Sequence, residues 1–430
     1  MSEYAVFTKE MKKDYTILVP TMLPVHFKMI VQILNLYGYK AELLENMGSE
    51  IKQLGLKYVH NDTCYPAQLV IGQMLDAINS GKYDTHKIAL MISQTGGGCR
   101  ASNYIFLLRK ALEKAGLGYI PVISFNVSGL DNNSGFKLTL PMIYRMMYAA
   151  LYGDLIMLLK NQCKPYELVD GDTDKLVDRW TKRLVDDMSL SVRYSNVKRN
   201  YREIIRSFDA IGKTGQKRKV RVGVVGEIFV KFSPLGNNNL EEFLMSENAE
   251  VVMPGLTDFA LYCIYNSIVD TDLYGEKRLK QIGAKILDKF ILKKQNDLIR
   301  IIREESKFDP MSSFAHTRTL AKDYINLGAK MGEGWLLTAE MLELIEQGVN
   351  NIVCAQPFGC LPNHIVGKGM MKPIKERHPN VNIAAIDYDS GTSVINQQNR
   401  IKLMLATAAE RERLSEKHEH ESREKTSANA

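Results

Sequence analysis

Long apolar runs and leader-like segments are missing from this sequence. Its 430 residues contain no stretch of about 18 consecutive apolar positions. The start, MSEYAVFTKEMKK, lacks the basic, apolar and small-residue regions of a leader. The content of 45% hydrophobic and 24% charged residues is typical of a soluble globular protein. We therefore expect a cytoplasmic protein with no membrane partner.

The sequence also lacks the pattern of a nucleic-acid groove. Its formal net charge of +7 is spread along the chain, and basic patches such as Lys213–Lys219 have no interleaved aromatic residues. A groove for single strands combines positive charge with aromatic side chains on which bases stack. We therefore expect no nucleic-acid partner.

Cysteine is scarce, and its placement argues against disulfides. Only six cysteines occur. Without a leader, metal binding or catalysis is the favoured use of such thiols, because the cytosol keeps cysteine reduced. No close CxxC pair and no ferredoxin-type cysteine run is present.

Nucleotide-binding glycine motifs are absent as well. The TGGG segment before Cys99 is neither GxGxxG nor a P-loop, so the chain shows no flavin or nicotinamide motif. Gly97 and Gly98 allow positive φ and close backbone approach, and their N–H groups are candidates for cofactor binding, to cluster sulfides or a phosphate. An ordinary strand-to-helix turn explains these glycines equally well.

Short apolar runs alternate with helical segments in both halves of the chain. Strand separated from strand by helix predicts a parallel, doubly wound sheet. We expect an α/β fold with two Rossmann-like domains and helical connecting and inserted segments. The expected strands are Tyr15–Pro20, Ala41–Glu45, Lys87–Ser93, Tyr119–Phe125, Val220–Glu227, Glu250–Pro254, Asn351–Gln356 and Asn382–Asp389.

The same pattern predicts the domain boundaries. An N-terminal α/β domain covers residues 1–140, and a helical connection with a basic linker covers 141–219. A C-terminal α/β domain with a helical insertion covers 220–408. Residues 409–430 form a charged tail without apolar periodicity.

Four cysteines lie near the carboxyl ends of strands or the starts of helices: Cys64, Cys99, Cys354 and Cys360. In doubly wound sheets these positions share one edge, and two facing domains would bring four thiolates together. Helix N-termini favour the thiolate form. We predict an iron–sulfur site, with structural zinc as the alternative. Cys163 and Cys263 lack this context, and Cys263 is expected in the core.

Two further residues are candidates for catalysis. Glu227 ends a strand, where a carboxylate is placed to act as an acid or base. His364 follows Cys360 and lies one turn before Lys368, where it would meet an anionic substrate or tune the cluster.

These residues carry a resemblance that spans about residues 10–405. The chain resembles the D-component family of 2-hydroxyacyl-CoA dehydratases, specifically homologues related to acyl-CoA dehydratase activases. The matching segments are MKKDYTILVP, NDTCYPAQLVIGQ, QTGGGCRASNY, GVVGEIFVKFSPLGNNNLEEF and CAQPFGCLPNHIVGKGM.

The resemblance implies a Rossmann-like protein that holds a [4Fe-4S] cluster, or a larger double-cubane cluster, between domains. It implies Cys64, Cys99, Cys354 and Cys360 as ligands. It also implies an ATP-dependent activase partner that supplies a low-potential electron for radical dehydration by a lyase, or for reduction of a CoA thioester, in anaerobic metabolism. Two related subunits are usual in that family, so a homologous subunit or a homodimer is a further expected partner.

Two points keep other functions open. The chain shows no activase-type nucleotide-binding domain, so ATP would act through a separate protein. A cluster with four cysteine ligands leaves no open iron, which favours electron transfer over dehydration. A non-catalytic electron-transfer or scaffold partner and a zinc-stabilised structural protein therefore remain as alternatives.

Overall fold

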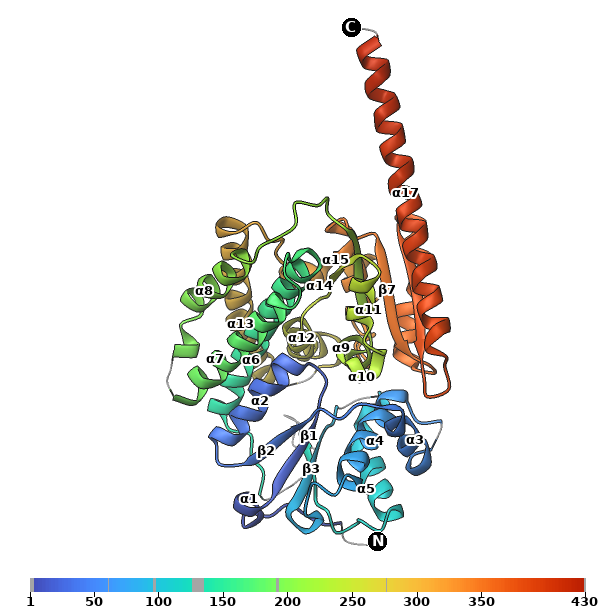
Figure 1. Ribbon diagram of the computed structural model, residues 1–430. Coiled ribbons are helices and arrows are strands. Elements are labelled where there is room, and N and C mark those ends of the chain that lie inside the picture. Colours follow the sequence, from blue (N-terminus) through green and yellow to red (C-terminus); the bar gives the residue numbers. More distant parts are fainter. Residues whose placement is uncertain are drawn as a thin grey trace.

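Two four-stranded parallel sheets form the framework of the molecule (Figure 1). The computed structural model describes residues 4–428 except 61, 96, 97, 126–134, 191, 192 and 276. The first sheet contains β1 (Thr16–Pro20), β2 (Lys40–Leu44), β3 (Ile88–Ser93) and β4 (Val122–Phe125). The second contains β5 (Val220–Gly226), β6 (Ala249–Val252), β7 (Asn351–Pro357) and β8 (Asn382–Tyr388). The predicted α/β fold is confirmed.

Both sheets have the same topology. The strand orders are β2-β1-β3-β4 and β6-β5-β7-β8, and every pair is parallel. The chain reverses its direction of winding between β1 and β3, and again between β5 and β7. In open α/β sheets, binding sites form outside the carboxyl ends of strands at such switch points.

Helices cover both faces of each sheet, which explains why the strands are almost continuously apolar. In β1, for example, Ile17, Leu18 and Val19 are all buried. The helices of the first unit are α1 (Met11–Asp14), α2 (Pro24–Leu36), α3 (Ser49–Tyr58), α4 (Tyr65–Asn79) and α5 (Tyr104–Lys114).

Three long helices connect the two sheets: α6 (Leu140–Cys163), α7 (Asp172–Leu190) and α8 (Val197–Asp209). Thr139 caps the first of them, because its Oγ1 accepts from the N–H of Met142. Within the described residues, α6 with its following turn is the one helix long and apolar enough to cross a membrane. Most of that apolar stretch is buried inside the fold, as in the core helix of a soluble protein.

The second unit has longer helical segments between its strands. Its helices are α9 (Ile228–Phe232), α10 (Pro234–Asn237), α11 (Leu240–Ser246), α12 (Leu256–Tyr274), α13 (Arg278–Glu305), α14 (Phe314–Leu320), α15 (Trp335–Glu346), α16 (Met371–Arg377) and α17 (Val394–Ala428). Helix α17 packs along the second sheet and then extends away from the body (Figure 1).

Candidate metal centre

Three cysteines lie at the starts of three helical segments between the two sheets. Cys64 is the N-cap of α4, and Cys99 is the N-cap of the short helix Arg100–Asn103 that follows β3. Cys360 follows β7 and precedes a helical segment, in which the N–H of His364 donates to the Cys360 carbonyl at 3.0 Å. We call Cys64, Cys99 and Cys360 the three-thiol site.

Electrostatic coupling links the members of the three-thiol site. The charge of Glu227 raises the pKa of all three thiols, and Cys99 in turn raises the pKa of Cys64. Gly332 lies between Cys99 and the Cys360 loop. A Cβ placed on this glycine would be 3.9 Å from the Cys99 Sγ and 3.5 Å from Pro362, so the two segments pack close to each other. The site therefore draws on both α/β units.

Burial dominates the chemistry of these thiols. Loss of solvent raises the pKa of Cys64 to about 11 and also raises the pKa of Cys99 and Cys360. The sulfurs of Cys64, Cys99 and Cys360 accept from the backbone N–H groups of Ala67, Ala101 and Asn363, respectively, in the helical turn that follows each cysteine. These contacts lower the pKa of the three thiols. The N–H groups and helix dipoles therefore favour negative charge at each sulfur once its proton has left.

Cys354 lies apart from the other three candidate ligands. It is fully buried within β7, where it pairs with Val225 and Ala385, and a Cβ on Gly367 would lie 3.3 Å from its Sγ. Burial raises its pKa to about 12, and the charges that act on it are those of Asp387, Glu340 and Lys368. The structure thus brings together three of the four predicted thiols and places the fourth in the core.

The remaining two cysteines differ from each other. Cys163 is buried, and its Sγ lies 3.6 Å from the Phe208 carbonyl oxygen. Cys263 is exposed on α12, so its expected place in the core is wrong.

A pair of carboxyl groups borders the three-thiol site. Glu227 caps α9 by accepting from the N–H of Val230 at 2.8 Å, and Glu333 accepts from the N–H of Ile228 at 3.0 Å. Burial, followed by the charge of Glu333, raises the pKa of Glu227 to about 8. Burial also raises the pKa of Glu333. Two carboxyl groups so placed retain a proton near neutral pH.

Asn363 joins this carboxyl pair to the thiols. Its side-chain Nδ2 donates to Glu333 at 3.3 Å and to the Cys360 Sγ at 3.4 Å. His364 donates from Nδ1 to the Cys360 carbonyl oxygen at 2.9 Å, which leaves its Nε2 as an acceptor. Lys368 faces Asp387 at 3.7 Å. His364 therefore supports the Cys360 turn directly, whereas Lys368 is directed to the neighbouring strand.

Gly98, which precedes Cys99, faces a loop of the second unit. A Cβ on Gly98 would lie 2.6 Å from the Sδ of Met331, so this glycine permits close approach of that loop. Gly97, the other predicted cofactor contact, lies outside the described residues.

Sequence reasoning missed Tyr104 and Glu333, as well as Asn363 described above. The Tyr104 hydroxyl lies 2.7 Å from the Cys64 Sγ, although the two residues are 40 positions apart. Glu333 lies in the connection before α15 and is 6% exposed. Tyr104 belongs to the QTGGGCRASNY segment, whose position at a helix start was a usable signal. The sequence around Glu333 gave no indication of a functional role, because the residues that it contacts come from distant parts of the chain.

The arrangement of the three thiols bears on which kind of metal group they could hold. Within the described ranges, no three His, Cys, Asp or Glu side chains are arranged to hold a single metal ion. A polynuclear iron–sulfur cluster places its thiolates farther apart than one ion does, and it requires soft, anionic sulfur ligands. Three thiols facing helical N–H groups fit that requirement better than they fit a four-ligand zinc site.

No protein-family model matches the chain, and a search of curated proteins gave no significant match. The fold and the geometry of the three-thiol site define an α/β protein with two similar parallel sheets and a candidate metal centre between them.

Proposed function

We propose that the chain is a cytoplasmic iron–sulfur protein that accepts a low-potential electron from an ATP-dependent activase. Its proposed reaction is radical dehydration of a 2-hydroxyacyl-CoA or reduction of a related CoA thioester. The observation that supports this proposal best is the three-thiol site, in which every cysteine begins a helical segment. The resemblance of the surrounding segments to dehydratase components adds the reaction class.

In this proposal Cys64, Cys99 and Cys360 hold a [4Fe-4S] cluster. Such a cluster supplies one-electron chemistry and, at an iron without a cysteine ligand, a Lewis-acidic position for a substrate oxygen. Cys354 is excluded from the ligand set because it is enclosed in β7. Three cysteine ligands favour a site that binds substrate over a closed electron relay.

The surrounding side chains have separate roles. Tyr104 orients the Cys64 sulfur through their 2.7 Å contact, and Asn363 orients the Cys360 sulfur. Glu227 and Glu333 retain one proton between them, because burial and mutual repulsion disfavour two negative charges. Loss of a hydroxyl group as water requires a proton at the departing oxygen, and this pair, beside the three-thiol site, holds one.

An anaerobic turnover experiment tests the proposal. The purified chain is reconstituted with iron and sulfide and mixed with an activase, ATP and reductant, and a panel of 2-hydroxyacyl-CoA thioesters is then added. We expect ATP-dependent reduction of the protein and formation of an enoyl-CoA product. The Glu227→Gln variant should retain reduction and lose most of the product.

Each other outcome points to a different function. Reduction without any product across the panel would favour the electron-carrier alternative. Zinc in the anaerobically purified protein, with no charge-transfer absorption, would contradict the iron–sulfur proposal and favour a structural role.

A further inference from the structure

A loop of the second α/β unit packs against the first unit at the three-thiol site. It consists of residues 329–334, and we call it the Glu333 loop. A Cβ on its Gly332 would lie 3.9 Å from the Sγ of Cys99, and a Cβ on Gly98 would lie 2.6 Å from the Sδ of Met331. Both Gly98 and Cys99 follow β3 of the first sheet. The loop therefore lies directly on the segment that presents Cys99.

The same loop carries one member of the carboxyl pair. Glu333 accepts at 3.0 Å from the N–H of Ile228 and at 3.3 Å from the Nδ2 of Asn363, and it is 6% exposed. These two partners belong to other segments of the chain, so both contacts depend on where the loop backbone lies. A residue that fixes the loop backbone therefore fixes both the cover over Cys99 and the position of Glu333.

Three residues of α12 hold this loop from one side. Tyr262, Asn266 and Asp270 follow one another at intervals of four residues, so they share one face of the helix. Asn266 accepts at 3.0 Å from the Nε1 of Trp335, which follows the loop. Asp270 forms an ion pair with Lys330 near the start of the loop.

Tyr262 holds the middle of the Glu333 loop. Its hydroxyl has one hydrogen, which is shared by the carbonyl oxygens of Lys330 at 2.8 Å and Gly332 at 3.0 Å. Burial raises the pKa of Tyr262, so the hydroxyl keeps this hydrogen. Gly334 makes room for the contact, because its φ is +49° and a Cβ there would lie 2.5 Å from the hydroxyl oxygen.

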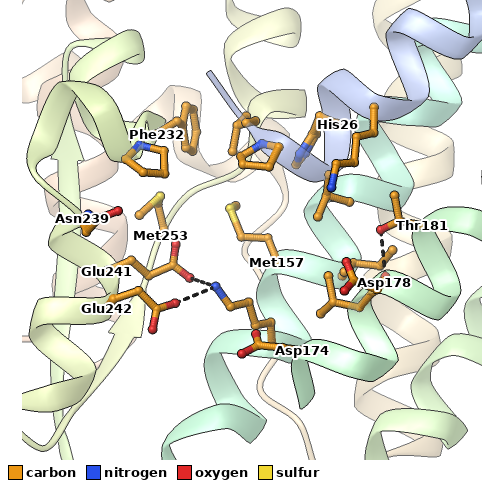
Figure 2. Close-up of a pocket in the computed structure, with 18 of the residues that line it drawn as sticks. His26, Met157, Asp174, Asp178, Thr181, Phe232, Asn239, Glu241, Glu242 and Met253 are labelled. Atoms are coloured by element: carbon orange, nitrogen blue, oxygen red, sulfur yellow. Dashed lines mark hydrogen bonds and ion pairs between the residues drawn. The ribbon is translucent and has the colours of Figure 1, made fainter. Parts of the chain in front are cut away.

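Helix α12 is itself anchored at its start. Asp154 of α6 accepts at 2.8 Å from the N–H groups of Leu256 and Thr257, the first two residues of α12. The same carboxylate lies 2.9 Å from the Nε2 of His26 on α2, at the edge of a cavity of about 340 Å³ (Figure 2). The helix that supports the loop is therefore fixed to α2 and α6.

We propose that Tyr262 is a positioning residue of the three-thiol site. Through the Glu333 loop it keeps Cys99 covered and sets the place of Glu333 in the carboxyl pair. Asn266 and Asp270 support the two ends of the same loop. This inference rests on the three-thiol site of the proposed function and not on the metal that the site holds. Its tests use the metal-free chain, so their outcome is separate from that of the iron–sulfur experiments.

Alkylation of the metal-free chain by iodoacetamide tests the cover over Cys99. Tyr262→Phe removes the hydroxyl and keeps the ring against Trp335, at a centroid distance of 5.0 Å. We expect Cys99 to react about fivefold faster or more in this variant, because the loop opens more often. Cys163, buried on α6, should react at the parent rate. An unchanged Cys99 rate, or an equal acceleration at Cys163, both measured by peptide mass spectrometry, would overturn the proposal.

Tyr265→Phe is the matched control. Tyr265 is also on α12 and packs on Trp335, with ring centroids 6.1 Å apart. In the described part of the chain, no hydrogen bond joins its hydroxyl to the Glu333 loop. We expect Cys99 to react at the parent rate in this variant. An acceleration as large as that in Tyr262→Phe would show that loss of a hydroxyl on α12, and not the loop contact, exposes Cys99.

A second variant loosens the loop and leaves Tyr262 in place. Asp270→Asn removes the ion pair with Lys330, so we expect Cys99 to react about twofold faster. The combination with Tyr262→Phe should accelerate the reaction further. A Cys99 rate that stays at the parent value in Asp270→Asn and in the combined variant would contradict the support of the loop by this face of α12.

Methyl NMR provides a readout that a general loss of stability would not move. In the chain labelled with ¹³C-methyl methionine, the Met331 signal, assigned from a Met331→Leu variant, reports on the loop where it meets Gly98. We expect this signal to shift in Tyr262→Phe and to stay in place in Tyr265→Phe. The signal of Met142, buried in the first turn of α6, should move in neither. An unmoved Met331 signal in Tyr262→Phe would refute the positioning role.

Discussion

The phenolic oxygen of Tyr104 lies 2.7 Å from the Sγ of Cys64 and joins the start of α5 to the start of α4. This contact lowers the pKa of Cys64, whereas burial raises that pKa to about 11. Tyr104 itself is buried, and its own pKa is raised by the same loss of solvent. The hydroxyl therefore acts as a neutral donor to the sulfur.

Replacing Tyr104 by phenylalanine removes that donor and little else. We expect the pKa of Cys64 to rise further, by about one unit, because only burial and the backbone N–H of Ala67 then remain as major influences. Thiolate absorbance at 240 nm during a pH titration, taken as the difference from a Cys64→Ala variant, measures the change. An unchanged titration would mean that the hydroxyl does not donate to the sulfur.

The carboxyl pair predicts a pH-dependent stability. The pKa of Glu227 is raised to about 8, so the folded state holds a proton that the unfolded chain releases near the ordinary carboxyl pKa. The contribution of Glu227 to stability is therefore most favourable at low pH and decreases as pH rises through the range from about 5 to 8, by on the order of 1 kcal/mol per unit at most.

Glu227→Gln removes this titrating group. We expect the variant to lose less stability than the parent between pH 5 and pH 8 in urea unfolding experiments. Parallel pH profiles for the two proteins would contradict the assignment of the retained proton to Glu227.

Gly226 is required for the turn that presents Glu227. Its φ is +150°, and a Cβ there would lie 1.9 Å from the carbonyl oxygen of Ala355 on the neighbouring strand. We expect Gly226→Ala to destabilise the fold by about 3 kcal/mol or more, because backbone atoms would have to move. Gly283→Ala, in an exposed and unobstructed turn of α13, should instead stabilise it by about 1 kcal/mol. Thermal unfolding of both variants provides the comparison, and a tolerated Gly226→Ala would contradict this reading of the turn.

The strands were predictable because their apolar runs are short and bounded by helical segments. The expected strand Val220–Glu227 is β5, Val220–Gly226, and the expected strand Asn351–Gln356 is β7, Asn351–Pro357. Parallel strands buried on both faces give a strong signal of this kind. The matching order of the two sheets depends on long-range pairing, which no local pattern encodes.

The site was predictable only in part, for a physical reason. Cys99 and Cys360 lie beyond the carboxyl ends of β3 and β7, where side chains are free to face a site. Cys354 lies in the middle of β7, and its side chain packs in the hydrophobic core on one face of the sheet. A strand buried on both faces has no polar alternation that would reveal this orientation from sequence.

The central claim is that Cys64, Cys99 and Cys360 hold an iron–sulfur cluster. Its most direct test is iron and sulfide analysis, with electron paramagnetic resonance, on anaerobically purified variants in which one cysteine at a time is replaced. We expect Cys64→Ala, Cys99→Ala and Cys360→Ala each to lose most of the iron and the reduced-cluster signal. Cys354→Ala and the exposed Cys263→Ala should retain both. Loss of the cluster in Cys354→Ala, with retention in Cys360→Ala and unchanged thermal stability of both, would contradict the three-thiol site.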